Sequence, residues 1–233
     1  MRERSGSASG RPASLRPVCS IDVITVTPRG RQLSVLFVRA DEQKSRARWE
    51  LPWESAHEGD LLGEVAHRIV RAATASDAAW LEQVGAFGAG RRHPSGGDIS
   101  VAYVAVVAHG DAGRIVSNAS WRSAAEVPSL SPRQRGMLDQ GLAAIRTRMD
   151  YAPIAFRLLA PMLTLGELQQ VYELLLGRKL HKASFRRALQ ASYLVEPTNE
   201  WRREGRGRPA QLFRYAPRNH KGGRRAVRFD LLS

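Results

Sequence analysis

The side chains with the clearest chemical potential are basic, and they fall into two groups in the last third of the chain. One group lies within residues 179–187, and the other lies within the arginine- and glycine-rich segment 201–209. Ammonium and guanidinium groups donate hydrogen bonds to phosphate oxygens, and arginine also reads base edges in the DNA grooves. We expect contacts with duplex DNA from Lys179, Lys182, Ser184, Arg186, Arg187, Arg202, Arg203, Arg206 and Arg208.

The elements that must position these side chains follow from local patterns. Thr164-Leu-Gly-Glu167 has the T-x-x-E spacing of a helix capping box, and Gly177 marks a helix end. A second helix is predicted over residues 182–192, and strands over residues 193–198 and 211–215. These elements predict a winged helix-turn-helix over residues 164–215, with the second helix in a DNA groove and the basic loop on the backbone or in the minor groove. The alternative is a solvated helix face beside a flexible hairpin tip.

The charge distribution also favours a polyanionic partner. The 233-residue chain carries a formal charge of +14, and residues 151–233 hold 16 Lys+Arg against 6 Asp+Glu. A basic surface that served only solubility would be spread evenly, so this concentration indicates a nucleic-acid interface. No segment has the length and hydrophobicity of a membrane span. The single cysteine, Cys19, excludes a disulfide framework and a cysteine metal cluster, and we expect a cytoplasmic protein.

The front half has the pattern of a separate domain. Strands are predicted over residues 18–27, 33–38, 81–87 and 99–108, with one helix over residues 61–73 among them. This order indicates an α+β fold, a mixed β-sandwich with helices. Ser131-Pro132 is expected to start a helix over residues 131–150, which either links two domains or is the last helix of the first. The expected parts are a disordered basic tail (1–17), a ligand-sensing and dimerisation domain (18–150), the winged helix (151–216) and a basic tail (217–233).

Residues 51–73 resemble a Nudix box that has lost its metal ligands. Leu51-Pro52 fits the lead-in of the box, and Asp60, Arg68 and Val70 fall on its glutamate, arginine and aliphatic positions. Residues that depart from the box are Trp53 and Glu54, in place of glycines, and Ile69, Ala72 and Ala73, in place of three glutamates. Those glutamates bind a divalent metal that neutralises a diphosphate under attack by water. Because Ile and Ala carry no lone pairs, we expect no metal, no cofactor and no catalysis; the alternative is an ordinary amphipathic helix that fits by chance.

The order of motifs along residues 21–215 is similar to that of the NrtR family of Nudix-related transcriptional regulators. The stretches that carry this resemblance include Thr164-Leu-Gly-Glu-Leu-Gln-Gln-Val-Tyr172, Ser184-Phe-Arg-Arg187, Gly205-Arg-Gly-Arg-Pro-Ala210, Arg48-Trp49 and Ser100-Val-Ala-Tyr103. The resemblance implies a repressor of genes for NAD or related metabolism. It also implies that the Nudix-like domain senses ADP-ribose or another nucleotide sugar or phosphorylated metabolite, and that a homodimer binds a palindromic operator.

Candidate contacts to the effector lie in the front half. Arginines can grip phosphates and tryptophans can stack on a base, although core packing explains the tryptophans equally well. The expected effector contacts are Arg39, Trp49, Trp53, Arg68, Arg91 and Arg92. Family members often carry Asp-Pro-Arg-Gly-Arg where this chain has His93-Pro-Ser-Gly-Gly97, which predicts a changed ligand or lost sensing. The histidines expected on the surface or in loops, without metal-ligand spacing, are His57, His67, His93 and His109, and no Ser-His-Asp set is evident.

Two other functions fit the same residues. A Nudix-type hydrolase with atypical ligands would use Glu54, Glu58, Asp60 and Glu64, and it would release ribose phosphate from ADP-ribose with magnesium. A constitutive DNA binder would use its front domain only to dimerise, and metabolites would not shift its melting temperature.

Overall fold

The front domain is built around strand β1 (Cys19–Arg29), which is buried from Ser20 to Pro28. The computed structural model describes residues 18–40, 49–88, 93–108, 115–149, 153–203 and 209–216. Strand β1 forms a hairpin with β2 (Gln32–Arg39), and Gly30 in the turn has a φ of +58° that favours glycine. Its other edge pairs in parallel with β6 (Ile99–Val106), which pairs antiparallel with β5 (Trp80–Phe87). The continuous run of β-branched residues from Val23 to Thr27 suits a strand that is buried on both faces and has neighbours on both edges.

Three short strands complete this sheet and were not predicted. Strand β4 (Trp53–Ser55) pairs with β1, while β3 (Trp49–Glu50) and β7 (Ala119–Ser123) pair with β2. Strands of two to five residues carry too little alternation to be recognised in a sequence, because their stability comes from the long strands beside them.

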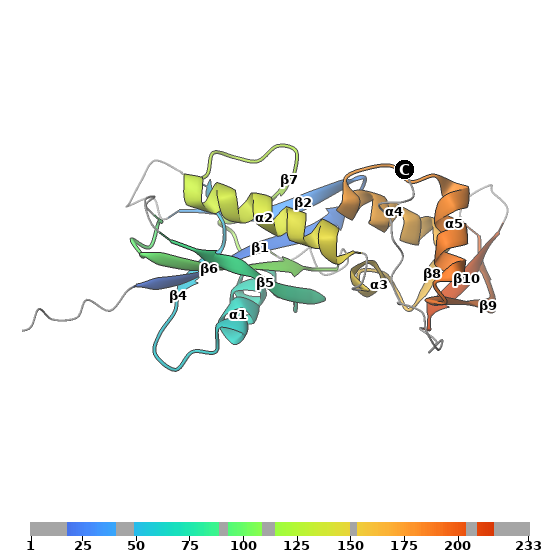
Figure 1. Ribbon diagram of the computed structural model, residues 1–233, viewed down its shortest axis with the longest axis horizontal. Helices are drawn as coiled ribbons and strands as arrows, with labels where there is room; N and C mark the ends of the chain where they lie inside the picture. The colour runs from blue at the N-terminus through green and yellow to red at the C-terminus, as the bar shows by residue number, and fades with distance from the viewer. Residues whose placement is uncertain are drawn as a thin grey trace, which may run out of the picture.

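Two helices cover the two faces of the sheet (Figure 1). Helix α1 (Leu62–Thr74) packs Val65 and Ile69 against Ile21 and Val23 of β1. Helix α2 (Pro132–Arg148) covers the opposite face, and a Cβ at its Gly141 would meet the Ile24 side chain at 3.2 Å. The predicted α+β sandwich is confirmed, and these two faces are called the α1 face and the α2 face below.

The C-terminal part is a small winged helix. It contains α3 (Ile154–Arg157), α4 (Leu165–Leu176), α5 (Lys182–Ala191) and a three-stranded sheet in the order β8 (Met162–Thr164), β10 (Ala210–Tyr215), β9 (Val195–Arg202). Both capping-box hydrogen bonds of Thr164 and Glu167 are present, as predicted. Strand β9 begins later than predicted because Tyr193 has a left-handed φ of +54°, and it extends to Arg202, inside the segment predicted as a loop.

A continuous apolar core joins the two parts. The cluster that includes Ile24 of β1 also includes Ile145 of α2 and Leu168 and Tyr172 of α4. Helix α2 lies on the sheet and its C-terminal end is directed toward α3 and α4 (Figure 1). The winged helix is therefore seated on the front domain, and α2 contacts both. Within the described ranges, none of the helices combines the length and hydrophobicity that a bilayer crossing requires.

Candidate functional site

The turn that leads into α5 is fixed by the carboxylate of Glu173. Its Oε1 accepts from the Leu180 amide (3.1 Å) and from Gln169 Nε2 (3.0 Å), and its Oε2 accepts from Lys179 Nζ (2.6 Å). Burial raises the pKa of Glu173, but these hydrogen bonds outweigh burial and leave the pKa below its ordinary value. The left-handed Gly177 (φ +70°) ends α4 and lets the chain reverse. Lys179, predicted as a DNA contact, thus also braces the turn while its side chain stays exposed.

Helix α5 presents a basic face opposite its buried face. Phe185 and Leu189 are completely buried, and the Phe185 ring packs 5.6 Å from that of Tyr172. Lys182, Arg186 and Arg187 are exposed, and no ion pair is recorded for them within the described part of the chain. Ser184 is partly buried, with its Oγ 3.2 Å from Nδ1 of His181, the N-cap residue. The pattern of charge outside and apolar rings inside is the form of a groove-reading helix.

The basic residues of the wing fall into two structural classes. Arg202 lies in β9 and turns inward, donating to Glu167 Oε1 (2.7 Å) and to the Met162 carbonyl (3.0 Å), so it links the wing to the start of α4. Arg203 follows it and is exposed. The other predicted contacts, Arg206 and Arg208, lie outside the described residues. The guanidinium of Arg202, which was expected to contact DNA, therefore makes its hydrogen bonds within the protein.

The helix of the Nudix-box resemblance turns apolar side chains toward the sheet. Ile69 and Ala73, which stand at glutamate positions, are 3% and 6% exposed, and Ile69 packs in the α1-face core. Asp60 accepts from the His57 amide (2.8 Å), which lowers the pKa of this carboxyl. Among the residues that the structure describes, no group of three or more His, Cys, Asp or Glu side chains is placed to bind a metal ion.

The predicted effector contacts lie on both faces of the sheet. Arg39 pairs with Trp49 across β2 and β3, and Trp53 pairs with Asp22 across β4 and β1; these side chains lie on the α2 face. Arg68 lies on α1 and donates to Glu54 (3.0 Å), which places it on the α1 face. Arg91 and Arg92 lie outside the described residues. Of the described four, Arg39, Trp49 and Trp53 lie on one face of the sheet, and Arg68 lies on the other.

Sequence reasoning missed Arg122 of β7. Its guanidinium lies 4.2 Å from the centre of the Trp49 ring, and that of Arg39 lies 5.2 Å from it. The Arg122 Nε atom is buried and has no hydrogen-bond partner among the described residues. The two arginines and Trp49 form an electropositive aromatic cluster, suited to an anionic ligand with a planar group. No local signal identified Arg122, since β7 itself was not predicted.

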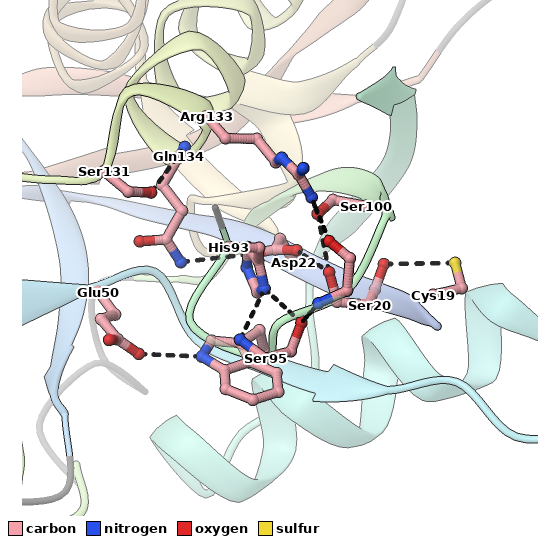
Figure 2. Close-up of polar contacts among 12 residues, drawn as sticks. Cys19, Ser20, Asp22, Glu50, His93, Ser95, Ser100, Ser131, Arg133 and Gln134 are labelled. Atoms are coloured by element: carbon pink, nitrogen blue, oxygen red, sulfur yellow. Dashed lines mark hydrogen bonds and ion pairs between the residues drawn. The ribbon is translucent and has the colours of Figure 1, made fainter. Parts of the chain in front are cut away.

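His93 was expected on the surface or in a loop, and it lies in a loop but is buried. His93 is 3% exposed, and its Nε2 lies 2.8 Å from Oδ1 of the fully buried Asp22. Figure 2 shows the two side chains next to each other. Its ring also meets Trp53 edge-on, with centres 5.2 Å apart. A single acidic residue inside the apolar strand at Asp22 was the available signal, because a carboxylate is rarely buried without a partner.

No Ser-His-Asp set was evident in the sequence, but the fold brings a serine, a histidine and an aspartate into contact. The Ser95 Oγ lies 2.7 Å from His93 Nδ1, so Ser95, His93 and Asp22 form a chain of contacts. However, Nδ1 also accepts from the Ser95 amide, and Ser95 Oγ accepts from the Gly97 amide. These bonds close a tight turn around the histidine. The set therefore anchors a loop on β1, and its polar groups are used in that structure.

Comparison with known proteins agrees with both halves of the fold. Residues 155–215 match the family described as "NrtR DNA-binding winged helix domain". The "ADPR responsive transcriptional repressor NtrR" of Acinetobacter baylyi is 29% identical over 207 residues, covering 86% of this chain and 82% of that protein. The crystal structure of Shewanella oneidensis NrtR complexed with a 27mer DNA superposes with a TM-score of 0.73 at 27% identity, covering 85% of this chain and 94% of that one.

A further relative supports the fold alone. A MutT/nudix family protein from Enterococcus faecalis superposes with a TM-score of 0.67 at 16% identity, covering 89% of this chain and 90% of that one. The winged-helix match, the two NrtR relatives and the Nudix-like sheet agree with the order of motifs in the sequence. Residues 155–215 belong to the NrtR winged-helix family, and the chain as a whole has the organisation of the NrtR proteins it resembles, with a Nudix-like domain followed by a C-terminal DNA-binding winged helix.

Proposed function

We propose that this chain is an ADP-ribose-responsive transcriptional repressor. It binds operator DNA through α5 and the wing, and it binds ADP-ribose in the Nudix-like domain. The observation that carries the proposal is the exposed basic face of Lys182, Arg186 and Arg187 on a winged helix that shares its core with the Nudix-like sheet. A ligand on that sheet can then change the placement of the reading helices.

The effector site of this proposal lies on the α2 face, where Arg39, Trp49 and Arg122 gather. Guanidinium groups bind a diphosphate with charge-assisted hydrogen bonds, and an indole ring stacks on adenine. The Acinetobacter relative, whose name describes it as ADPR-responsive, aligns over most of this chain. This likeness favours ADP-ribose over the changed ligand or lost sensing that residues 93–97 led us to expect. Trp53 lies on the same face and widens the aromatic surface, while Arg68 on the α1 face is left out of the site.

The proposed regulator is not an enzyme. The carboxylates that a Nudix hydrolase uses to hold magnesium are replaced by Ile69, Ala72 and Ala73, and Ile69 faces the core. The Acinetobacter relative is named a transcriptional repressor. ADP-ribose would therefore be bound and released unchanged.

Two copies of the chain would bind a palindromic operator, in the cytoplasm. A winged helix of this size reads one half-site, and a two-fold dimer places two reading helices about 34–36 Å, one helical turn, apart. Binding of ADP-ribose would favour an arrangement in which this spacing no longer fits. The size of the response is set by the difference in affinity of ADP-ribose for the two arrangements.

The proposal is tested in two steps. Duplexes that bind the full-length chain are selected from a random pool, and the molecular mass of the selected complex is then measured. A palindromic consensus bound by two chains is the expected result. In parallel, ADP-ribose is incubated with the protein and magnesium, and the products are separated. Steady release of ribose phosphate would identify a hydrolase with atypical metal ligands. If no consensus sequence is selected, the chain does not bind a specific operator.

A further inference from the structure

The loop of residues 93–97 is fixed to β1 through His93. His93 Nδ1 accepts from the Ser95 amide (3.1 Å), so its Nε2 carries the proton and donates to Asp22 Oδ1 (2.8 Å). At the end of the loop, a Cβ on Gly97 would come within 2.9 Å of the Val18 carbonyl oxygen. The Ser95 Oγ accepts from the Gly97 amide (3.0 Å). The loop is therefore closed on itself and seated against the start of the central strand.

The first turn of α2 also contacts Asp22 and the loop of residues 93–97 (Figure 2). Gln134 Nε2 donates to Asp22 Oδ1 (3.3 Å), the oxygen that also accepts from His93. Arg133 Nη1 donates to the Gly97 carbonyl (2.8 Å) and to Ser100 Oγ (3.3 Å). Asp22 thus joins the loop to the helix, and we call Asp22, His93, Arg133 and Gln134 the buried joint.

The far end of α2 reaches the winged helix. At 1.5 Å per residue, the 17 residues of α2 span about 25 Å. Ile145 and Met149 at its C-terminal end share a core with α4, and a Cβ on Gly177 would lie 3.5 Å from Arg146 Nη2. Helix α2 thus contacts the joint at one end and α4 at the other. Because the helix is rigid, a displacement at the joint would also move the winged helix.

The joint also contains groups that this arrangement leaves unsatisfied. Arg133 is 7% exposed and Gln134 is completely buried, yet Arg133 Nε and Gln134 Oε1 have no hydrogen-bond partner among the described residues. Leaving a buried polar atom unpaired has a free-energy cost. An alternative arrangement of the first turn of α2 that gave these two atoms partners would recover that cost. This is the condition for an element with two populated arrangements.

We propose that the buried joint transmits effector binding to the DNA-binding domain. The proposal rests on the proposed function and adds the route by which the ligand acts. Trp53, on the effector face, contacts the His93 ring directly, so a ligand that moves Trp53 moves the anchor of the loop. The movement of His93 and Asp22 then changes the position of the first turn of α2. Helix α2 in turn displaces α4 and α5. His93 and Gln134 are positioning residues here, and neither contacts DNA.

The test uses the full-length chain and measures three constants for each variant: operator affinity, ADP-ribose affinity, and the factor by which ADP-ribose weakens operator binding. His93→Ala removes the anchor of the loop, and Gln134→Met removes the contact from α2 at similar volume. The matched controls are His57→Ala, at an exposed histidine, and Gln140→Met, at an exposed glutamine of the same helix. Thermal unfolding of every variant confirms that it is folded.

The coupling factor of the wild type is expected in the common range of about 5–150-fold. In His93→Ala and in Gln134→Met it should fall toward one, while both controls keep the wild-type factor. Because the two residues act through one joint, the double variant should lose no more coupling than either single variant. Full coupling in Gln134→Met, or additive losses in the double variant, would overturn the joint as the route. A wild type that binds no ADP-ribose would overturn the proposed function itself, which is a distinct outcome.

Discussion

Asp22 and His93 are 71 positions apart in the chain, yet Asp22 Oδ1 and His93 Nε2 lie 2.8 Å apart with both side chains completely buried. A buried carboxylate is tolerated only when its oxygens are satisfied, and Ser20, His93 and Gln134 satisfy those of Asp22. The strand, the loop and α2 therefore meet at one acidic side chain. In the proposed route, ligand binding on the α2 face displaces α2 through this side chain.

The basic face of α5 predicts a loss of operator affinity in Arg186→Ala. Removing one bidentate base contact costs about 1–3 kcal/mol, which is a 5- to 150-fold rise in the dissociation constant. Removing a phosphate contact instead lowers the salt slope by about 0.9. Fluorescence anisotropy of a labelled duplex at several salt concentrations distinguishes the two. Arg135→Ala, at an exposed arginine of α2 paired with Asp139, is the control and should bind as the wild type does.

The two neighbouring arginines of the wing should behave differently. Arg202→Ala removes the hydrogen bonds to Glu167 and to the Met162 carbonyl, so it should lower the melting temperature of the winged helix. The loss should be small, since both partners of the ion pair are about one-third exposed. Arg203→Ala should leave the melting temperature unchanged and weaken operator binding. The reverse pattern in calorimetry and binding would contradict the assignment of Arg202 as a structural residue.

Acid should weaken the turn between α4 and α5 through Glu173. Its pKa in the folded protein lies below the ordinary value of 4.5, so its contribution to stability is present above that value and is lost as the pH falls through the folded pKa. The melting temperature of Glu173→Gln should therefore lie below that of the wild type at pH 7, and the difference should shrink toward pH 3. Glu200→Gln, at an exposed residue of β9, is the control. A difference that stays constant with pH would show that the charge of Glu173 does not brace the turn.

Packing of α2 on the sheet depends on Gly141. Leucine at this position would collide with Ile24, and overpacking of a core costs about 1–3 kcal/mol. Gly136→Leu on the same helix is the matched control, because a Cβ at Gly136 meets nothing within 4 Å. Denaturant titration should show a clear loss for Gly141→Leu and none for Gly136→Leu. Equal losses at both sites would mean that α2 does not lie as close to β1 as the structure places it.

The elements with a strong local signal were predictable from the sequence. The capping box at Thr164, the glycine at Gly177 and the apolar spacing of Phe185 and Leu189 define α4 and α5 without any tertiary information. The main sheet was also predicted, because β1, β2, β5 and β6 are long enough to show strand periodicity. The Nudix-like fold and the winged helix were confirmed.

The candidate site was less predictable, because its residues come together only through the fold. Arg122 stacks on Trp49 from a strand of five residues whose pairing depends on β2. Arg68 and Trp53 were both predicted as effector contacts, although the sheet separates their side chains. The burial of His93 depends on Asp22 and on the first turn of α2, and neither is a neighbour in sequence. Long-range pairing of this kind leaves no pattern within a window of residues.

The central claim is that this chain binds operator DNA and that ADP-ribose binding releases it. The most direct test is a single titration. ADP-ribose is added to the complex of the full-length protein with its selected duplex, in EDTA, and the anisotropy of the labelled duplex is followed. The account predicts that the duplex is released at saturating ADP-ribose and that the ADP-ribose is recovered intact. A complex that stays bound at every ADP-ribose concentration would contradict it.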